Sequence, residues 1–118
     1  MQNLKDNLIV KLTFEFALDI IEYSDLLRSL HKYRMADQLF DSGTSIGANV
    51  REAQNAESKN DFIHKMKIAV KEADETDYWL LLCKNSKGYP NSDHLLKKLD
   101  SIIKILSKII GTSKRSLK

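Results

Sequence analysis

The stretch FIHKMKIAVKEADETDYWLLLC, residues 62–83, decides the fold. Its apolar and small residues recur at alternating intervals of four and three, which is the spacing of a heptad seam and not the alternation of a strand. The seam comprises Phe62, Met66, Ala69, Ala73, Thr76, Leu80 and Cys83. The stretch therefore predicts a long helix that buries one side against neighbouring helices.

Residues that start and stop helices mark the ends of this helix. Ser58 followed by Asp61 resembles a capping box in which aspartate replaces glutamate, so we expect the helix to begin near Ser58. Gly88 can adopt a left-handed cap, and Pro90 cannot continue a helix. The predicted helix thus spans about residues 58–86.

Three further segments repeat apolar residues at mixed intervals of three and four, and no segment shows a strand pattern. The predicted helices span about residues 6–31, 34–56, 58–86 and 92–110. We expect Gly111 to stop the last helix and to leave a flexible tail at residues 112–118. This pattern is typical of a helix bundle, so the predicted fold class is all-α, with one domain over residues 1–118.

Composition places the chain among compact folded domains. It has 118 residues, 42% of them hydrophobic, and one proline, which excludes a disordered or collagenous chain. The single cysteine, Cys83, allows neither an internal disulfide nor a cysteine zinc cage, and a reduced cytoplasmic setting fits best. No apolar run approaches the length of a membrane span, and residues 1–16 lack the features of a signal peptide, so we expect no membrane partner.

The stretch LFDSGTSIGANVREA, residues 39–53, places two glycines inside a predicted helix, where each costs about 1 kcal/mol relative to alanine. A phosphate loop needs a preceding strand and a lysine, and a dinucleotide fingerprint needs a third glycine. Gly43-x-Ser45-x-Gly47 matches the bare pattern of a nucleophile elbow, but such an elbow needs a strand before it. We therefore interpret both glycines as a flat helix side that lets another helix approach closely, within the bundle or across a subunit contact.

Polar and aromatic residues close to this flat side complete a predicted packing or interface set. Ser45, Asn49 and Glu52 lie at i, i+4 and i+7 and form a polar stripe. Trp79 falls just off the heptad seam, where aromatic side chains are typical of subunit interfaces, while base stacking is its alternative use. The set comprises Gly43, Ser45, Gly47, Asn49, Glu52, Glu75 and Trp79.

No cluster of residues predicts an enzyme. Asp61-x-x-His64 resembles one half of a di-iron motif, but the second histidine motif that such bundles need is missing. Glu72 and Glu75 lie one turn apart, which fits paired acid and base roles as well as ordinary polar contacts. We expect no catalytic residue, no cofactor and no metal.

Several joined segments resemble one known family. The segments are SGTSIGANVREA (42–53), SKNDFIHKMKIAVKEADETDYWLLL (58–82) and GYP (88–90). They match a small-Ser-Ile-x-x-Asn-Ile/Val-x-Glu segment, a Ser-x-x-Asp-Phe helix start and a third helix with Ala-x-x-Glu-x-x-Glu-Thr-x-x-Trp-Leu. Over most of its length the chain is similar to the 23S rRNA-intervening-sequence protein family. It departs from the family at Gly47, where proline or alanine is usual, and at Arg51, where a small residue is common.

This resemblance implies an antiparallel up-down-up-down four-helix bundle that assembles into a homopentamer and has no established enzyme activity. Members of the family are encoded within insertions in bacterial ribosomal RNA genes or stand alone in bacterial genomes. A similar bundle serves diversity-generating retroelements as an accessory protein that binds nucleic acid and a reverse transcriptase. By analogy, the expected partners are RNA or DNA and a reverse transcriptase or another protein.

Positive charge is concentrated in the last third of the chain. Residues 84–118 carry a net charge of +7, whereas residues 1–83 carry −4 and the whole chain +3. The predicted nucleic-acid surface comprises Lys97, Lys98, Lys104, Lys108, Lys114 and Arg115. Five such surfaces around a ring would hold a polyanion, with release of counterions. The alternative is a protein-interaction scaffold with no nucleic-acid role, in which the lysines serve only solubility.

Overall fold

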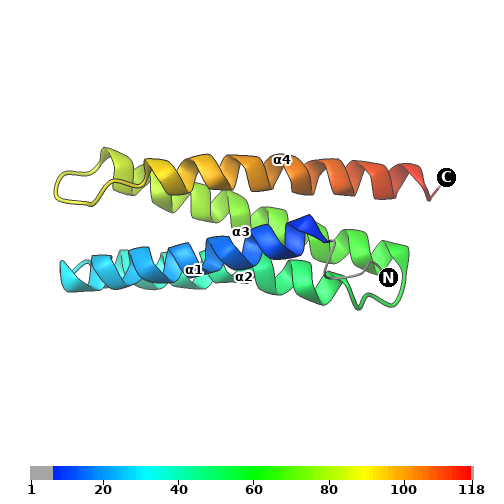
Figure 1. Cartoon of the computed structure of the whole chain (residues 1–118), viewed down its shortest axis with the longest axis horizontal. Helices are drawn as coiled ribbons and strands as arrows, with labels where there is room; N and C mark the ends of the chain where they lie inside the picture. Colours follow the sequence, from blue (N-terminus) through cyan, green and yellow to red (C-terminus); the bar gives the residue numbers. More distant parts are fainter. Residues whose placement is uncertain (1–6, 118) are drawn as a thin grey trace.

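A computed structural model describes residues 7–117 and contains four α-helices in this part of the chain (Figure 1). The helices are α1 (Leu8–Ser29), α2 (Tyr33–Ala53), α3 (Lys59–Asn85) and α4 (Asp93–Arg115). No strand occurs within these described residues. The prediction of an all-α fold with four helices is therefore confirmed.

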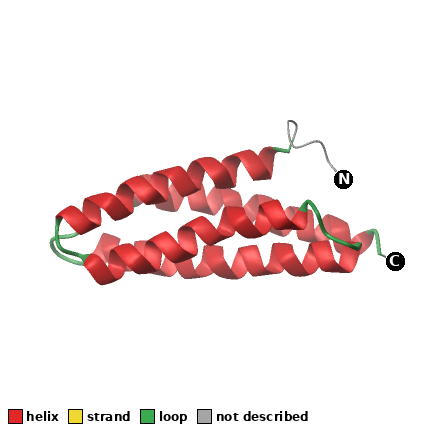
Figure 2. Cartoon of the chain, turned by 90° about the horizontal axis from the view of Figure 1, so that it is seen from below, coloured by secondary structure: helices red, strands yellow, loops and turns green. Residues whose placement is uncertain are grey.

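The helices form an elongated bundle that measures 50 × 22 × 21 Å along its principal axes. Consecutive helices pack against each other, and α1 also lies beside α4, although this last pair is packed less closely. The α1–α2 and α3–α4 connections lie at one end of the molecule and the α2–α3 connection at the other (Figures 1 and 2). No helix in the described part of the chain has the length and apolar character that a membrane crossing requires.

All four helices contribute to one hydrophobic core. Its largest fully buried side chains include Phe16 of α1, Leu39 of α2, Met66 of α3 and Leu99 of α4. On α3 the buried residues are Ile63, Met66, Ala69, Ala73, Thr76, Leu80 and Cys83. The predicted seam is thus wrong at its first position, because Phe62 is only partly buried and Ile63 takes its place.

The predicted start of α3 is confirmed. Ser58 is the N-cap, and its hydroxyl accepts a hydrogen bond of 3.0 Å from the backbone N–H of Asp61. The carboxylate of Asp61 accepts a bond of 3.1 Å from the backbone N–H of Glu57, one residue before the cap. At the other end α3 stops at Asn85, and Gly88 in the following loop has φ = +81°, the left-handed region that glycine favours.

The ends of the other helices differ from the prediction. The predicted stop at Gly111 is wrong, because α4 continues to Arg115 and residues 112–115 are helical. One glycine costs a helix only about 1 kcal/mol, and the packing of Ile109 and Ile110 against the core compensates for it. Residue 6, the predicted start of the first helix, and residue 118 of the predicted tail lie outside the described residues.

The α1–α2 connection begins earlier than predicted. α1 ends at Ser29, because His31 adopts φ = +63° and its left-handed backbone cannot continue the helix. α2 then starts at Tyr33 and ends at Ala53, three residues before the predicted end.

Candidate interaction surfaces

Both glycines of α2 face α1. A Cβ on Gly43 would lie 2.7 Å from Cγ2 of Ile20, a side chain that is fully buried. A Cβ on Gly47 would lie 3.2 Å from the carbonyl oxygen of Thr13. The close approach at these glycines is therefore between two helices of the same chain.

The predicted polar stripe of α2 hydrogen-bonds within its own helix. The hydroxyl of Ser45 donates to the carbonyl oxygen of Asp41 at 2.5 Å, and the amide of Asn49 donates to the carbonyl oxygen of Ser45 at 2.8 Å. Glu52, the third member, is exposed. A cross-helix bond is instead made by residues outside the predicted set, because the hydroxyls of Ser42 and Thr76 meet at 2.9 Å in the buried α2–α3 contact.

The two carboxylates predicted as a pair on α3 lie in different surroundings, because Glu72 is partly buried and Glu75 is exposed. Glu75 is exposed and takes part in no ion pair within residues 7–117. Partial burial raises the pKa of Glu72 above its usual value, and the negative charges of Glu75 and Asp41 raise it further. Glu72 is therefore repelled by Glu75 of its own helix and by Asp41 of α2.

The aromatic pair of α3 lies at the edge of the bundle. The rings of Tyr78 and Trp79 are 5.4 Å apart between centroids, and Trp79 is half-buried. The indole nitrogen of Trp79 is buried and has no hydrogen-bond partner among the described residues. Tyr78, Leu81 and Leu82 are exposed, so this part of α3 presents an apolar surface, which we call the α3 patch.

A larger apolar surface lies on α1 and α2, and the sequence analysis missed it. Phe14 and Leu18 are 56% and 52% exposed, and Ile21 of α1 and Phe40 of α2 are also exposed. A hollow of about 180 Å³ lies next to Phe14 and is lined by Val10, Phe14, Ala17, Thr44, Gly47, Ala48 and Arg51. We call this surface the α1–α2 face. Its signal in the sequence is the spacing of Phe14, Leu18 and Ile21 at i, i+4 and i+7, outside the buried seam.

Two of the six residues in the predicted nucleic-acid surface are paired with carboxylates. Lys98 reaches across to α1, where its ammonium lies 2.6 Å from the carboxylate of Asp19. Lys104 lies 2.9 Å from Asp100, one turn earlier on its own helix. Both lysines are therefore partly neutralised.

The other four residues, Lys97, Lys108, Lys114 and Arg115, are exposed and take part in no ion pair within residues 7–117. Two lysines of α3, Lys59 and Lys67, lie beside the end of α4. The sequence-based prediction did not include them. Lys59 donates to the hydroxyl of Ser116 at 2.6 Å. The positive charge of the neighbouring Lys114 on α4 lowers the pKa of Lys67 on α3. We call Lys59, Lys67, Lys108, Lys114 and Arg115 the basic end.

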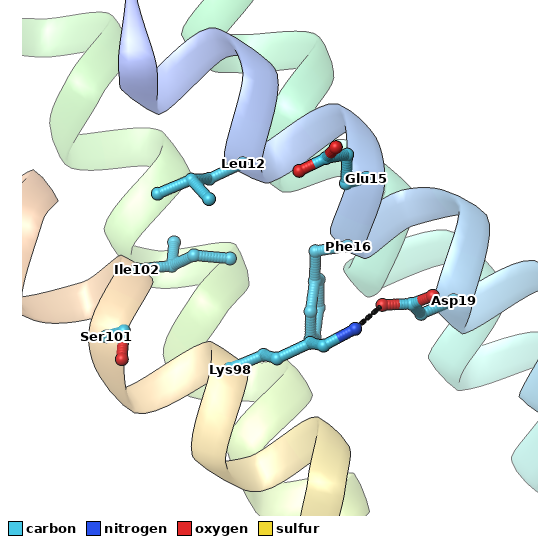
Figure 3. Close-up of a pocket in the computed structure, with 7 residues that line it drawn as sticks. All are labelled: Leu12, Glu15, Phe16, Asp19, Lys98, Ser101 and Ile102. Carbon is cyan, nitrogen blue, oxygen red and sulfur yellow. Dashed lines mark hydrogen bonds and ion pairs between the residues drawn. The ribbon is translucent and has the colours of Figure 1, made fainter.

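A cleft separates α1 from α4 near the middle of the bundle (Figure 3). It has a volume of about 230 Å³ and an apolar part formed by Leu12, Phe16 and Ile102. Glu15, Asp19, Lys98 and Ser101 supply its polar lining. The ion pair between Lys98 and Asp19 bridges the two helices here, as the dashed line in Figure 3 marks.

Within the described residues, no three His, Cys, Asp or Glu side chains are grouped so that they would hold a metal ion. Asp61 of the half di-iron motif serves the start of α3, and His64 is exposed. The described residues therefore present apolar and basic surfaces and contain no cluster of ligating side chains.

Comparisons with known proteins agree with this fold. Residues 5–108 match the family described as 23S rRNA-intervening sequence protein. A crystal structure of a protein of unknown function from the S23 ribosomal protein family of Bacteroides thetaiotaomicron is similar to the chain, with 39% sequence identity and a TM-score of 0.83. The alignment covers 87% of this chain and 98% of that chain. No curated protein matches the chain.

Proposed function

Because the chain belongs to the 23S rRNA-intervening sequence protein family, whose similar solved member has no known function, we propose its function from its surfaces. The proposed function is that of a non-enzymatic, oligomeric helical protein that binds RNA or DNA through the basic end. The family resemblance and the buried free thiol of Cys83 favour a reducing cytoplasm as its location.

One observation carries the nucleic-acid proposal. Lys67 and Lys114 are both exposed, Lys114 lies near enough to Lys67 to lower its pKa, and neither has a carboxylate partner within residues 7–117. A phosphate placed between two such ammonium groups relieves their mutual repulsion and releases counterions from the nucleic acid. Lys59, Lys108 and Arg115 extend the same positive surface over the adjoining ends of α3 and α4.

The oligomer in this proposal is a ring of five subunits, the number that the family resemblance implies. The α1–α2 face and the α3 patch are two different apolar surfaces on one subunit. A contact between two different surfaces repeats from subunit to subunit and closes into a ring when the rotation permits. The same surfaces favour the second candidate function, a protein-interaction scaffold whose partner is another polypeptide.

The test is fluorescence anisotropy of labelled structured RNA and duplex DNA titrated with the protein at several salt concentrations. We expect binding that weakens steeply as salt rises, since each neutralised phosphate adds about −0.9 to the log–log slope on duplex DNA. The double charge reversal Lys67→Glu and Lys114→Glu should weaken binding. It should also reduce the magnitude of the log–log slope by about 2, roughly 1 for each lost phosphate contact.

The matched control is the double reversal Lys71→Glu and Lys97→Glu, which changes the net charge by the same amount on exposed positions of α3 and α4 outside the basic end. Its slope should stay close to that of the unmodified protein. Equal effects of both double reversals would contradict the assignment to the basic end. No binding even at low salt would remove the nucleic-acid proposal and leave the scaffold function.

A further inference from the structure

The end of the bundle opposite the basic end brings together two connections that are far apart in the sequence. The α1–α2 turn and the α3–α4 loop both lie at this end in the two views (Figures 1 and 2). The ammonium of Lys32 lies 4.7 Å from the centroid of the Tyr89 ring, a cation–π contact between the two connections. The hydroxyl of Tyr23 donates to the carbonyl oxygen of Pro90 at 2.7 Å and holds the loop against α1. We call this end the tip.

Two aromatic rings are fixed on the surface of the tip. Nδ1 of His31 lies 2.7 Å from the hydroxyl of Tyr33, and the ring centroids are 5.7 Å apart in an edge-to-face arrangement. The left-handed backbone of His31 is held by the bond from its N–H to the carbonyl oxygen of Arg28 at 3.0 Å. Tyr33 is nevertheless 51% exposed. The tip therefore offers an ordered tyrosine ring to a partner.

Charged side chains of both connections lie at the tip. Arg28 pairs with Asp37 and Lys84 pairs with Asp93 at 3.2 Å, which neutralises these two carboxylates, whereas the exposed Asp25 near the end of α1 has no ion pair within residues 7–117. Arg34 and Lys87 are exposed and have no carboxylate partner within residues 7–117. The tip thus combines exposed aromatic rings with uncompensated cations, and the α1–α2 face and α3 patch lie along the sides of the bundle and leave the tip open.

We propose that the tip is a second contact surface, specific for single-stranded nucleic acid, in which an unpaired base stacks on Tyr33 while Arg34 and Lys87 contact phosphates. An aromatic platform beside cations is the usual way in which proteins bind single strands without reading their sequence. Bases inside a duplex are stacked on each other and cannot reach the ring, so the tip selects single strands, loops and ends. This inference rests on the proposed function, because it adds a contact to a protein that binds nucleic acid through its basic end.

The experiment compares Tyr33→Ala with the unmodified protein in anisotropy titrations of a labelled single-stranded RNA, a single-stranded DNA and the corresponding duplex. Loss of one stacking platform should weaken single-strand binding by about 5- to 150-fold and leave duplex binding unchanged. Tyr33→Phe is the matched control, because it keeps the ring and removes only the hydroxyl that meets His31. It should retain binding to both single strands, and circular dichroism should show that both variants keep the helical fold.

The failures of the two proposals are distinguishable. Unchanged single-strand binding by Tyr33→Ala overturns the inference, and the proposed function still stands if reversal of Lys67 and Lys114 weakens binding. An equal loss for the duplex also overturns it, because stacking on an unpaired base cannot explain that result. If the unmodified protein binds neither single strands nor duplex, the proposed function fails and the inference fails with it.

Discussion

At Gly43 the α1 and α2 helices approach so closely that even a methyl group meets a buried neighbour. The hypothetical Cβ would lie 2.7 Å from one carbon and 2.8 Å from another of the Ile20 side chain. Ile20 is β-branched and fully buried, so it has little freedom to move away. Gly111 of α4 is different, because its nearest neighbour is the flexible end of Arg115 at 3.6 Å.

We predict that Gly43→Ala lowers the free energy of unfolding by up to about 2 kcal/mol. Overpacking of about 1–3 kcal/mol outweighs the helix propensity of about 1 kcal/mol that alanine adds. Gly111→Ala, the control, has space for its methyl group and should raise the free energy of unfolding by about 0.5–1 kcal/mol. Urea titrations followed by circular dichroism measure both values. An increase in the free energy of unfolding for both variants would contradict the prediction, because it would show that Ile20 can move to accommodate the added methyl group.

At the scale of single helices, α1 and α4 distribute their apolar residues differently. α4 buries Leu95, Leu99, Ile102 and Leu106, and its lysines are exposed. α1 buries one seam but also exposes Phe14 and Leu18. A helix needs only one apolar side to pack into a bundle. The second apolar side of α1 is therefore best explained as a surface for a partner.

The start of α3 depends on reciprocal hydrogen bonds between Ser58, Asp61 and Glu57. The backbone N–H of Glu57 lowers the pKa of the Asp61 carboxyl below its usual value, with a further contribution from Lys65. Since the folded pKa is the lower one, this contribution to stability is complete above pH about 4 and is lost as the pH falls through the folded pKa.

We predict that Ser58→Ala lowers the free energy of unfolding by about 1 kcal/mol, because it leaves the N–H of Asp61 without its acceptor. Thermal unfolding at neutral pH measures the effect. Ser107→Ala is the control, since Ser107 is exposed in the interior of α4 and alanine is the better helix former there. A loss of stability in the control as large as that of Ser58→Ala would contradict the capping explanation.

At the scale of the whole molecule, the fold separates the surfaces that the proposals use. The basic end and the tip lie at opposite ends of a bundle 50 Å long, while the α1–α2 face and the α3 patch lie along its sides. This separation allows apolar contacts between subunits to form without covering either charged end. In the ring proposed above, one polyanion would meet several basic ends.

We predict that the protein is an oligomer in solution and that Leu18→Glu shifts it toward the single chain of 13.5 kDa. Leu18 is 52% exposed in the isolated subunit, so the charge disturbs a contact between subunits and not the core. Light scattering coupled to size-exclusion chromatography measures the mass, and circular dichroism checks that the helices remain. Ser107→Glu, which adds the same charge at an exposed position of α4 away from the α1–α2 face, is the control and should keep the mass unchanged.

A mass of 13.5 kDa for the unmodified protein at every concentration tested would contradict the oligomer. An unchanged mass for Leu18→Glu would place the contact elsewhere than on the α1–α2 face.

Local sequence determined the helices of this protein, because periodicity and capping act over a few residues. The spacing of Met66, Ala69 and Ala73 is enough to assign α3, and Ser58 is enough to start it. The stop expected at Gly111 was wrong, since the packing of the helix outweighs the cost of one glycine.

Only the tertiary structure decided how distant residues combine. It paired Lys98 with Asp19 and brought Lys67 to Lys114, and it placed Lys32 over the ring of Tyr89. Each of these contacts depends on how two helices or loops are aligned along the bundle, and no pattern within one segment encodes that alignment. The lysines of α4 were therefore found from the sequence, whereas their neutralisation, their α3 partners and the aromatic tip were not.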